Sequence, residues 1–95
     1  MTTKNATPQT CHLILFVTGK TVLSQAAESG VRKLCADLKS CELKVLDVLD
    51  EYQAAVQFGI FATPCLLLQE TGTKVVGDLS NPQAVLNALG LRQKT

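Results

Sequence analysis

The spacing of apolar residues changes along the chain, and each change marks a new element. The run CHLILFVT, residues 11–18, is apolar almost throughout and too short for a buried helix. We therefore expect a strand that is covered on both faces. From about Val22 to Leu38, apolar residues recur every three or four positions, which predicts an amphipathic helix. Gly30 lies inside this helix and should weaken it by roughly 1 kcal/mol relative to alanine.

A second strand and a second helix follow. The segment from about Glu42 to Val48 alternates and then fills with Val and Leu, which predicts a strand. A strand, a helix and a strand in this order predict a parallel pair with a right-handed crossover. Asp50 has the type and place of a helix N-cap, and Gln53 completes a capping-box spacing. A short helix should run from about Glu51 to Phe58 and end at Gly59.

The remaining segments predict a hairpin and a last helix. Two short apolar runs, Cys65–Gln69 and Thr73–Gly77, flank the sequence ETGT. Gly72 can supply the positive φ that the connecting turn requires.

The last helix should be capped by Ser80 or Asn81, with Pro82 in its first turn. Its apolar positions are Val85, Leu86, Ala88 and Leu89, and Gly90 is placed to end it.

The predicted order is β-α-β-α-β-β-α, an α/β domain with a four-stranded mixed sheet and helices on both faces. We assign residues 11–91 to this single domain. Residues 1–10 are polar and contain Pro8, which predicts a flexible tail, and residues 92–95 should fray.

Composition narrows the function. Apolar residues make up 46% of the 95 residues and charged ones 18%, which is typical of a folded domain. The net charge is +1, and the Lys and Arg residues are scattered. We therefore expect no nucleic-acid or membrane-surface binding. No apolar run approaches the ~20 residues of a membrane span, and the start lacks a signal-peptide pattern, so we expect a cytoplasmic protein.

The cysteines give no metal or redox motif. Cys11, Cys35, Cys41 and Cys65 form no C-x-x-C pair, and His12 is the only histidine. We expect reduced, mostly buried thiols, no metal and no cofactor.

The sequence Gly19-Lys20-Thr21 resembles the end of a phosphate-binding loop. That loop needs another glycine well before the Gly-Lys pair, and Ile14 stands at that position, within the predicted strand. We therefore expect a strand-to-helix turn here and no nucleotide site.

The predicted topology is that of the thioredoxin fold, and FGIFATPCLLL resembles the segment around its cis-proline. The resemblance implies that Pro64 is cis. In redox members a dithiol follows the first strand, but here Thr21 and Ser24 stand near those positions. Hydroxyls cannot carry out thiol–disulfide exchange, so that dithiol activity should be absent.

A closer resemblance is to the KaiB family of cyanobacterial clock proteins. It rests on LKVLDVLDEYQAA, FATPCL and GDLSN, and covers about residues 13–91. The sensor domain of the clock kinase SasA is the next nearest relative. The resemblance implies a non-enzymatic module that binds the ATPase KaiC, competes with SasA and captures KaiA. It also implies a fold switch between a resting tetramer and a thioredoxin-like monomer that binds partners.

The chain differs from the family at positions that bear on the fold switch. The stretch LLLQETGTKVV lacks the family's proline cluster, and Ala88 and Gly90 stand where the family has a glycine and an acidic residue. Alanine favours the last helix by up to ~1 kcal/mol over glycine. We expect a protein held mainly in the thioredoxin-like fold, a monomer or dimer in preference to a tetramer.

For the partner surface we single out the second strand and second helix, with Lys44, Asp47, Tyr52 and Gln53 as candidate contacts. Lys44 and Asp47 match the family. Tyr52 is the only tyrosine and aromatic anchors dominate interfaces. A basic residue of the family is replaced around Phe58 and Gly59. We therefore expect altered partner choice and reduced affinity.

Two other functions stay open. A monothiol redox protein could use Cys65, which follows the predicted cis-proline, if its pKa were lowered. A chaperone-like stress protein would need an exposed apolar patch, which no sequence feature marks.

Overall fold

The protein is described by a computed structural model that covers residues 11–38, 41–77 and 79–90. Within this part of the chain the order of elements is the predicted one. The elements are β1 (Cys11–Val17), α1 (Val22–Asp37), β2 (Cys41–Asp47), α2 (Tyr52–Gln57), β3 (Cys65–Leu68), β4 (Thr73–Val76) and α3 (Pro82–Leu89). The predicted tail, residues 1–10, and the predicted frayed end, residues 92–95, lie outside the described residues.

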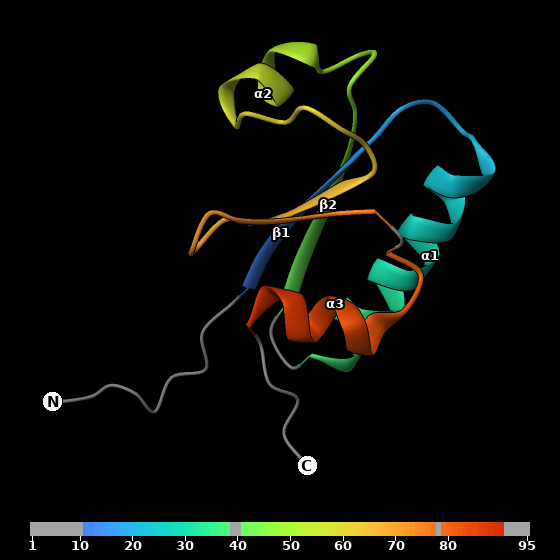
Figure 1. The fold of residues 1–95 in the computed structure, drawn as a ribbon, viewed down its shortest axis with the longest axis vertical. Helices are drawn as coiled ribbons and strands as arrows, with labels where there is room; N and C mark the ends of the chain where they lie inside the picture. Colours follow the sequence, from blue (N-terminus) through green and yellow to red (C-terminus); the bar gives the residue numbers. More distant parts are fainter. Residues whose placement is uncertain (1–10, 39–40, 78, 91–95) are drawn as a thin grey trace, which may run out of the picture.

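The strands form one mixed sheet in the order β2-β1-β3-β4, which confirms the predicted architecture (Figure 1). β1 pairs in parallel with β2 and antiparallel with β3, and β3 pairs antiparallel with β4. β1 is therefore central, and its residues from Leu13 to Val17 are all buried. This burial on both faces explains why β1 is apolar without alternation.

The helices cover the two faces of the sheet unequally (Figure 1). α1 and α3 pack together on one face, over alternate residues of the strands such as Leu13, Leu15 and Leu66. The short α2 covers part of the other face, where Ala55 meets Phe16 and Leu67. We call these the α1/α3 face and the α2 face.

Gly30 is a packing residue as well as a weak helix position. A Cβ atom at Gly30 would lie 2.5 Å from the backbone oxygen of Leu79 and 2.8 Å from Cα of Ser80. α1 therefore meets the segment that leads into α3 at a distance that only glycine permits. The helix tolerates this glycine because it allows the two segments to pack.

The predicted start of α2 is wrong. α2 begins at Tyr52 with Glu51 at the N-cap position, and no side chain caps it. The turn before it is organised by Asp47, whose backbone oxygen accepts from the N–H groups of Asp50 and Glu51. Because Asp50 lies inside this turn, it does not occupy the N-cap position.

The other predicted turn and cap residues are confirmed. Asn81 caps α3 through its side chain, which accepts from the N–H groups of Gln83 and Ala84, and Gly90 ends α3 in the left-handed region at φ +76°. Gly72 has φ +77°, and the Thr63–Pro64 peptide bond is cis.

Candidate protein-binding surface

A groove opens between α2 and the loop that leads to Pro64. It has a volume of about 350 Å³, and its walls include Thr18, Tyr52, Val56, Phe61 and Thr63. The hydroxyl groups of Thr18 and Thr63 share a hydrogen bond of 2.6 Å. This bond links the residue after β1 to the residue before the cis-proline, and both residues line the groove.

Large apolar side chains stand exposed around this groove. Phe61 is 97% exposed and Val56 66%, and both line the groove. Tyr52, which also lines the groove, is mostly exposed too. We call Tyr52, Val56 and Phe61 the α2 patch. Exposed apolar groups gathered at one place are typical of interaction surfaces, and of these residues only Tyr52 was predicted as a contact from the sequence.

Local structure explains why these side chains are exposed. α2 has six residues, and Ala55 is its one fully buried residue. Two small side chains, Ala55 and the partly buried Ala54, anchor the helix, so the larger Tyr52 and Val56 face solvent. Phe61 lies in the irregular connection between α2 and β3, beyond the reach of the core.

Two of the predicted contact residues lie at this surface. Tyr52 and Gln53 begin α2, are both exposed, and border a second hollow with Val56 and Gln57. Tyr52 also lines the groove, so it belongs to both hollows.

The other two predicted contact residues lie elsewhere. Lys44 is exposed on the edge strand β2 and borders a separate hollow with His12 and Glu42. Asp47 is half-buried and already engaged. One of its carboxylate oxygens accepts from the N–H of Gly19 at 3.2 Å, and the other from the N–H of Leu49 at 2.9 Å. Asp47 therefore holds two turns together.

The positions that match the redox dithiol of the fold have structural roles. The Thr21 side chain caps α1 by accepting from the N–H of Ser24 at 3.0 Å. Ser24 is buried, and its hydroxyl donates to the backbone oxygen of Thr18 at 3.4 Å. These hydrogen bonds join the end of β1 to the first turn of α1.

Cys65 lacks the surroundings of a reactive thiol. It is buried in the core of the α2 face, and this burial raises its pKa, although Lys74 acts in the opposite direction. A thiol that stays protonated and lies away from solvent is a poor nucleophile.

The prediction of reduced thiols is wrong for two of the cysteines. Cys35 and Cys41 form a disulfide, with Cα atoms 5.4 Å apart, while Cys11 and Cys65 are free. The sequence offered no C-x-x-C motif, but α1 ends and β2 begins at neighbouring places in the fold. Among the described residues, no cluster of His, Cys, Asp and Glu could hold a metal ion.

His12 is the centre of a small ionic cluster. Its backbone N–H donates to one carboxylate oxygen of Glu70 at 2.9 Å, and its ring Nδ1 lies against the other. The hydrogen bond with Glu70 raises the pKa of His12, and bonds from His12 lower the pKa of Glu70. This contact joins β1 to the turn between β3 and β4.

No family model matches the chain. The chain is 34% identical over 83 residues to "Circadian clock protein KaiB3" of Synechocystis sp., which spans 83% of this chain and 81% of the relative. It is 37% identical over 91 residues to "Circadian clock oscillator protein KaiB" of Picosynechococcus sp., which spans 92% and 88%.

Among solved structures, the N-terminal domain of Synechococcus elongatus SasA matches with a TM-score of 0.68. This match has 24% identity and covers 94% of this chain and 88% of that one. At this identity the match supports the fold, which is α/β and thioredoxin-like. None of the helices in the described part of the chain is long and apolar enough to cross a membrane.

Proposed function

The chain belongs to the KaiB family, and we propose that it is a non-catalytic interaction module that docks on a KaiC-type ATPase through the α2 patch. The α2 patch is the observation that carries this proposal. Its relatives are circadian clock proteins by name, so we propose a role in circadian or related signalling. We place this role in the cytoplasm.

The composition of the α2 patch suits a protein interface. Two aromatic side chains, Tyr52 and Phe61, flank a groove that a partner side chain could fill. Aromatic anchors of this kind supply a large share of binding energy. Gln53 supplies a polar group at the edge of this surface. Lys44 pairs with Ile14 of the α2-face core and therefore lies on the same sheet face, in a separate hollow, as a further candidate contact. An apolar centre with a polar rim is the usual anatomy of an interface.

We further propose that the protein stays mainly in the thioredoxin-like fold, as a monomer or dimer. In the structure Ala88 lies inside α3 and Gly90 ends that helix in the conformation that glycine favours. The β3–β4 hairpin needs only Gly72 at its turn and contains no proline. These features favour the hairpin-then-helix order. KaiA-like or SasA-like proteins would be further partners or competitors.

The two other functions have less support. The burial and raised pKa of Cys65 disfavour a monothiol redox enzyme. The α2 patch does supply the apolar surface that a chaperone-like protein needs, which the sequence did not mark. A chaperone would suppress the aggregation of unrelated unfolded proteins, whereas a docking module would not.

The proposal is tested by size-exclusion chromatography with light scattering, on the protein alone and with a KaiC-type ATPase and ATP. We expect a monomer or dimer that co-migrates with the ATPase. Phe61→Ala and Val56→Ala should weaken this binding at least tenfold. Val76→Ala is a matched control. Val76 is also an exposed valine, at 55%, but it lies on the edge strand β4 and does not line the groove.

Equal binding by the Val56→Ala and Val76→Ala variants would contradict docking through the α2 patch. A tetramer that binds slowly would show that the fold switch survives. Absence of binding to any KaiC-type ATPase would overturn the proposed partner.

A further inference from the structure

We propose that Cys11, Cys35 and Cys41 form a thiol–disulfide exchange site, in which an external dithiol reduces the Cys35–Cys41 disulfide and Cys11 can replace Cys35 as the partner of Cys41. This site is independent of the proposed docking surface. It also lies away from the turn between β1 and α1 where redox members of the fold carry their dithiol.

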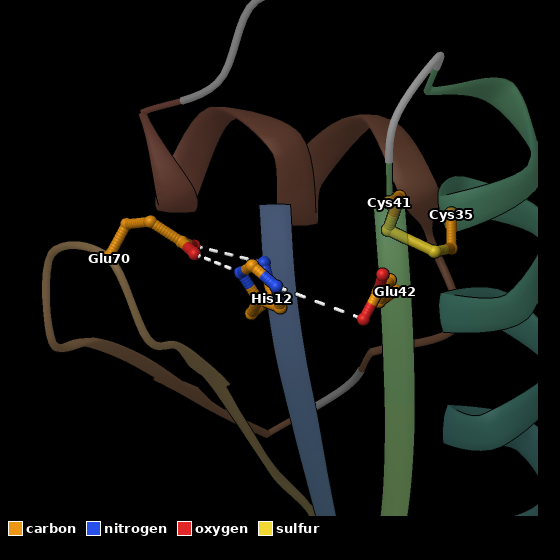
Figure 2. The surroundings of a disulfide bond; sticks show 5 residues. All are labelled: His12, Cys35, Cys41, Glu42 and Glu70. Atoms are coloured by element: carbon orange, nitrogen blue, oxygen red, sulfur yellow. Dashed lines mark hydrogen bonds and ion pairs between the residues drawn. A yellow bond between two sulfur atoms is a disulfide. The ribbon is translucent and has the colours of Figure 1, made fainter. Parts of the chain in front are cut away.

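The fold brings three cysteines to one end of the sheet. Cys35 lies in the last turn of α1, and its disulfide reaches Cys41 at the start of β2 (Figure 2). Cys11 begins β1, and the parallel register places it directly beside Cys41. Neighbouring strands lie about 4.8 Å apart. This spacing is within the range of Cα separations found in disulfides.

Cys11 and Cys41 also face the same side of the sheet. Both pack against the core of the α1/α3 face, the face that carries α1 and therefore Cys35. Paired positions on adjacent strands direct their side chains to the same face. The Cys11 thiol therefore approaches the disulfide at its Cys41 end.

Exposure separates this cluster from the fourth cysteine. Cys11, Cys35 and Cys41 are each only partly buried, whereas Cys65 is buried on the α2 face. A disulfide that a reductant can reach is the kind that exchanges, because attack requires access to a sulfur atom. Cys65 thus provides an internal control for an unreactive thiol in the same molecule.

The site can undergo two thiol–disulfide exchange reactions, and each conserves atoms and electrons. A dithiol attacks one sulfur of Cys35–Cys41 through a mixed disulfide and leaves two protein thiols and one oxidised dithiol, a transfer of two electrons. Alternatively, the Cys11 thiolate attacks the sulfur of Cys41, so that a Cys11–Cys41 bond forms and Cys35 leaves as a thiolate. The second step needs no external oxidant.

The surroundings of Cys11 should slow the second step. Burial raises the pKa of Cys11, and the negative charge of Glu70 adds to this effect. The thiolate of Cys11 is therefore scarce at neutral pH, so the test is best performed at about pH 8.5.

The first experiment is a redox titration of the folded protein in buffers of reduced and oxidised dithiothreitol. Free thiols are trapped by alkylation and assigned by peptide mass spectrometry. We expect reversible loss and recovery of the Cys35–Cys41 bond while circular dichroism stays native. Cys65 should react at least tenfold more slowly than Cys11. A bond that never forms, or that is reduced only after unfolding, would overturn the proposal.

The second experiment isolates Cys11. In the Cys35→Ser variant, glutathione disulfide should first modify Cys41, and Cys11 should then displace glutathione to give a Cys11–Cys41 bond. The matched control, Cys35→Ser with Cys11→Ser, should stop at the mixed disulfide with glutathione. If the single variant also stops there, Cys11 has no part in the exchange.

Discussion

The two faces of the sheet differ in how completely they are covered. Among the described residues, the core of the α1/α3 face contains twelve buried side chains and that of the α2 face five. The α1/α3 face is covered by helices of 16 and 8 residues, and the α2 face by one of 6. The side with the larger core carries more of the stability, because the hydrophobic contribution grows with buried apolar area.

Because α2 is short, it leaves apolar side chains on its own face of the sheet exposed. The three large side chains of the α2 patch remain in solvent beside a groove, although apolar residues favour burial. The protein can keep this surface exposed because the other face holds the fold together. The proposed binding surface and the larger core thus lie on opposite sides of one sheet, and this division can be tested by substitution.

The largest effect is expected at the centre of the α1/α3 face. Leu34 on α1 is fully buried, and Leu34→Ala should lower the free energy of unfolding by about 3 kcal/mol because it leaves a cavity. Denaturant unfolding followed by circular dichroism measures this change. A loss below about 1 kcal/mol would mean that this face does not dominate stability.

The disulfide should add less to the same face. It closes a short loop between residues separated by 6 positions. Reduction should therefore lower the free energy of unfolding by about 2 kcal/mol, through a gain of entropy in the unfolded chain. For a domain of this size the Tm should fall by roughly 8–16 °C.

Calorimetry with and without dithiothreitol measures the effect of reduction. The variant with both Cys35→Ser and Cys11→Ser is the control, and its Tm should not respond to the reductant. A wild-type Tm that is also unchanged would contradict this stabilisation.

The same truncation on the α2 face should barely affect stability. Phe61 is almost fully exposed, so Phe61→Ala should change the free energy of unfolding by less than about 0.5 kcal/mol. Denaturant unfolding beside Leu34→Ala provides the comparison. A cost near that of Leu34→Ala would show that Phe61 packs in solution and would remove it from the α2 patch.

The smallest effect concerns the ionic contact between His12 and Glu70. The pKa of His12 is raised in the folded protein, so its contribution is complete below about pH 6.5 and is lost as the pH rises through the raised value. The pKa of Glu70 is lowered, so its contribution is present above about pH 4.5 and is lost as the pH falls through the lowered value. The contact should be strongest between these limits.

Comparison with His12→Gln tests this contact. The difference in Tm between wild type and variant should shrink as the pH rises from about 6 to 8. Proton NMR should give a His12 titration midpoint above that of a free histidine. A midpoint at or below the free value would contradict the contact with Glu70.

Local signals in the sequence were enough for most of the fold. Features that depend only on residues nearby in the sequence were predicted in the right role. They are the apolar run of β1, the apolar period of α1, the turn glycine Gly72 and the helix cap Asn81. The cis bond before Pro64 was implied by resemblance. The prediction that Asp50 caps α2 was wrong because Asp47, three residues earlier, organises the turn through both its backbone and its side chain.

The candidate site was less predictable because it depends on non-local arrangement. Tyr52 and Gln53 are exposed at the expected helix, but Phe61 was missed, since a phenylalanine between apolar segments is usually buried. The disulfide and the contact of His12 with Glu70 join segments that meet only in the folded sheet. No spacing rule within one element reveals such pairs.

The central position of β1 has a consequence for the synthesis of the protein. β1 is made before the other strands in the described part of the chain, but its partner β3 begins only at Cys65. A nascent chain therefore carries the apolar run from Leu13 to Val17 with one edge unpaired until most of the domain has been translated. Unpaired apolar strands attract other chains. The yield of folded protein should thus depend on how quickly the second half of the chain follows the first.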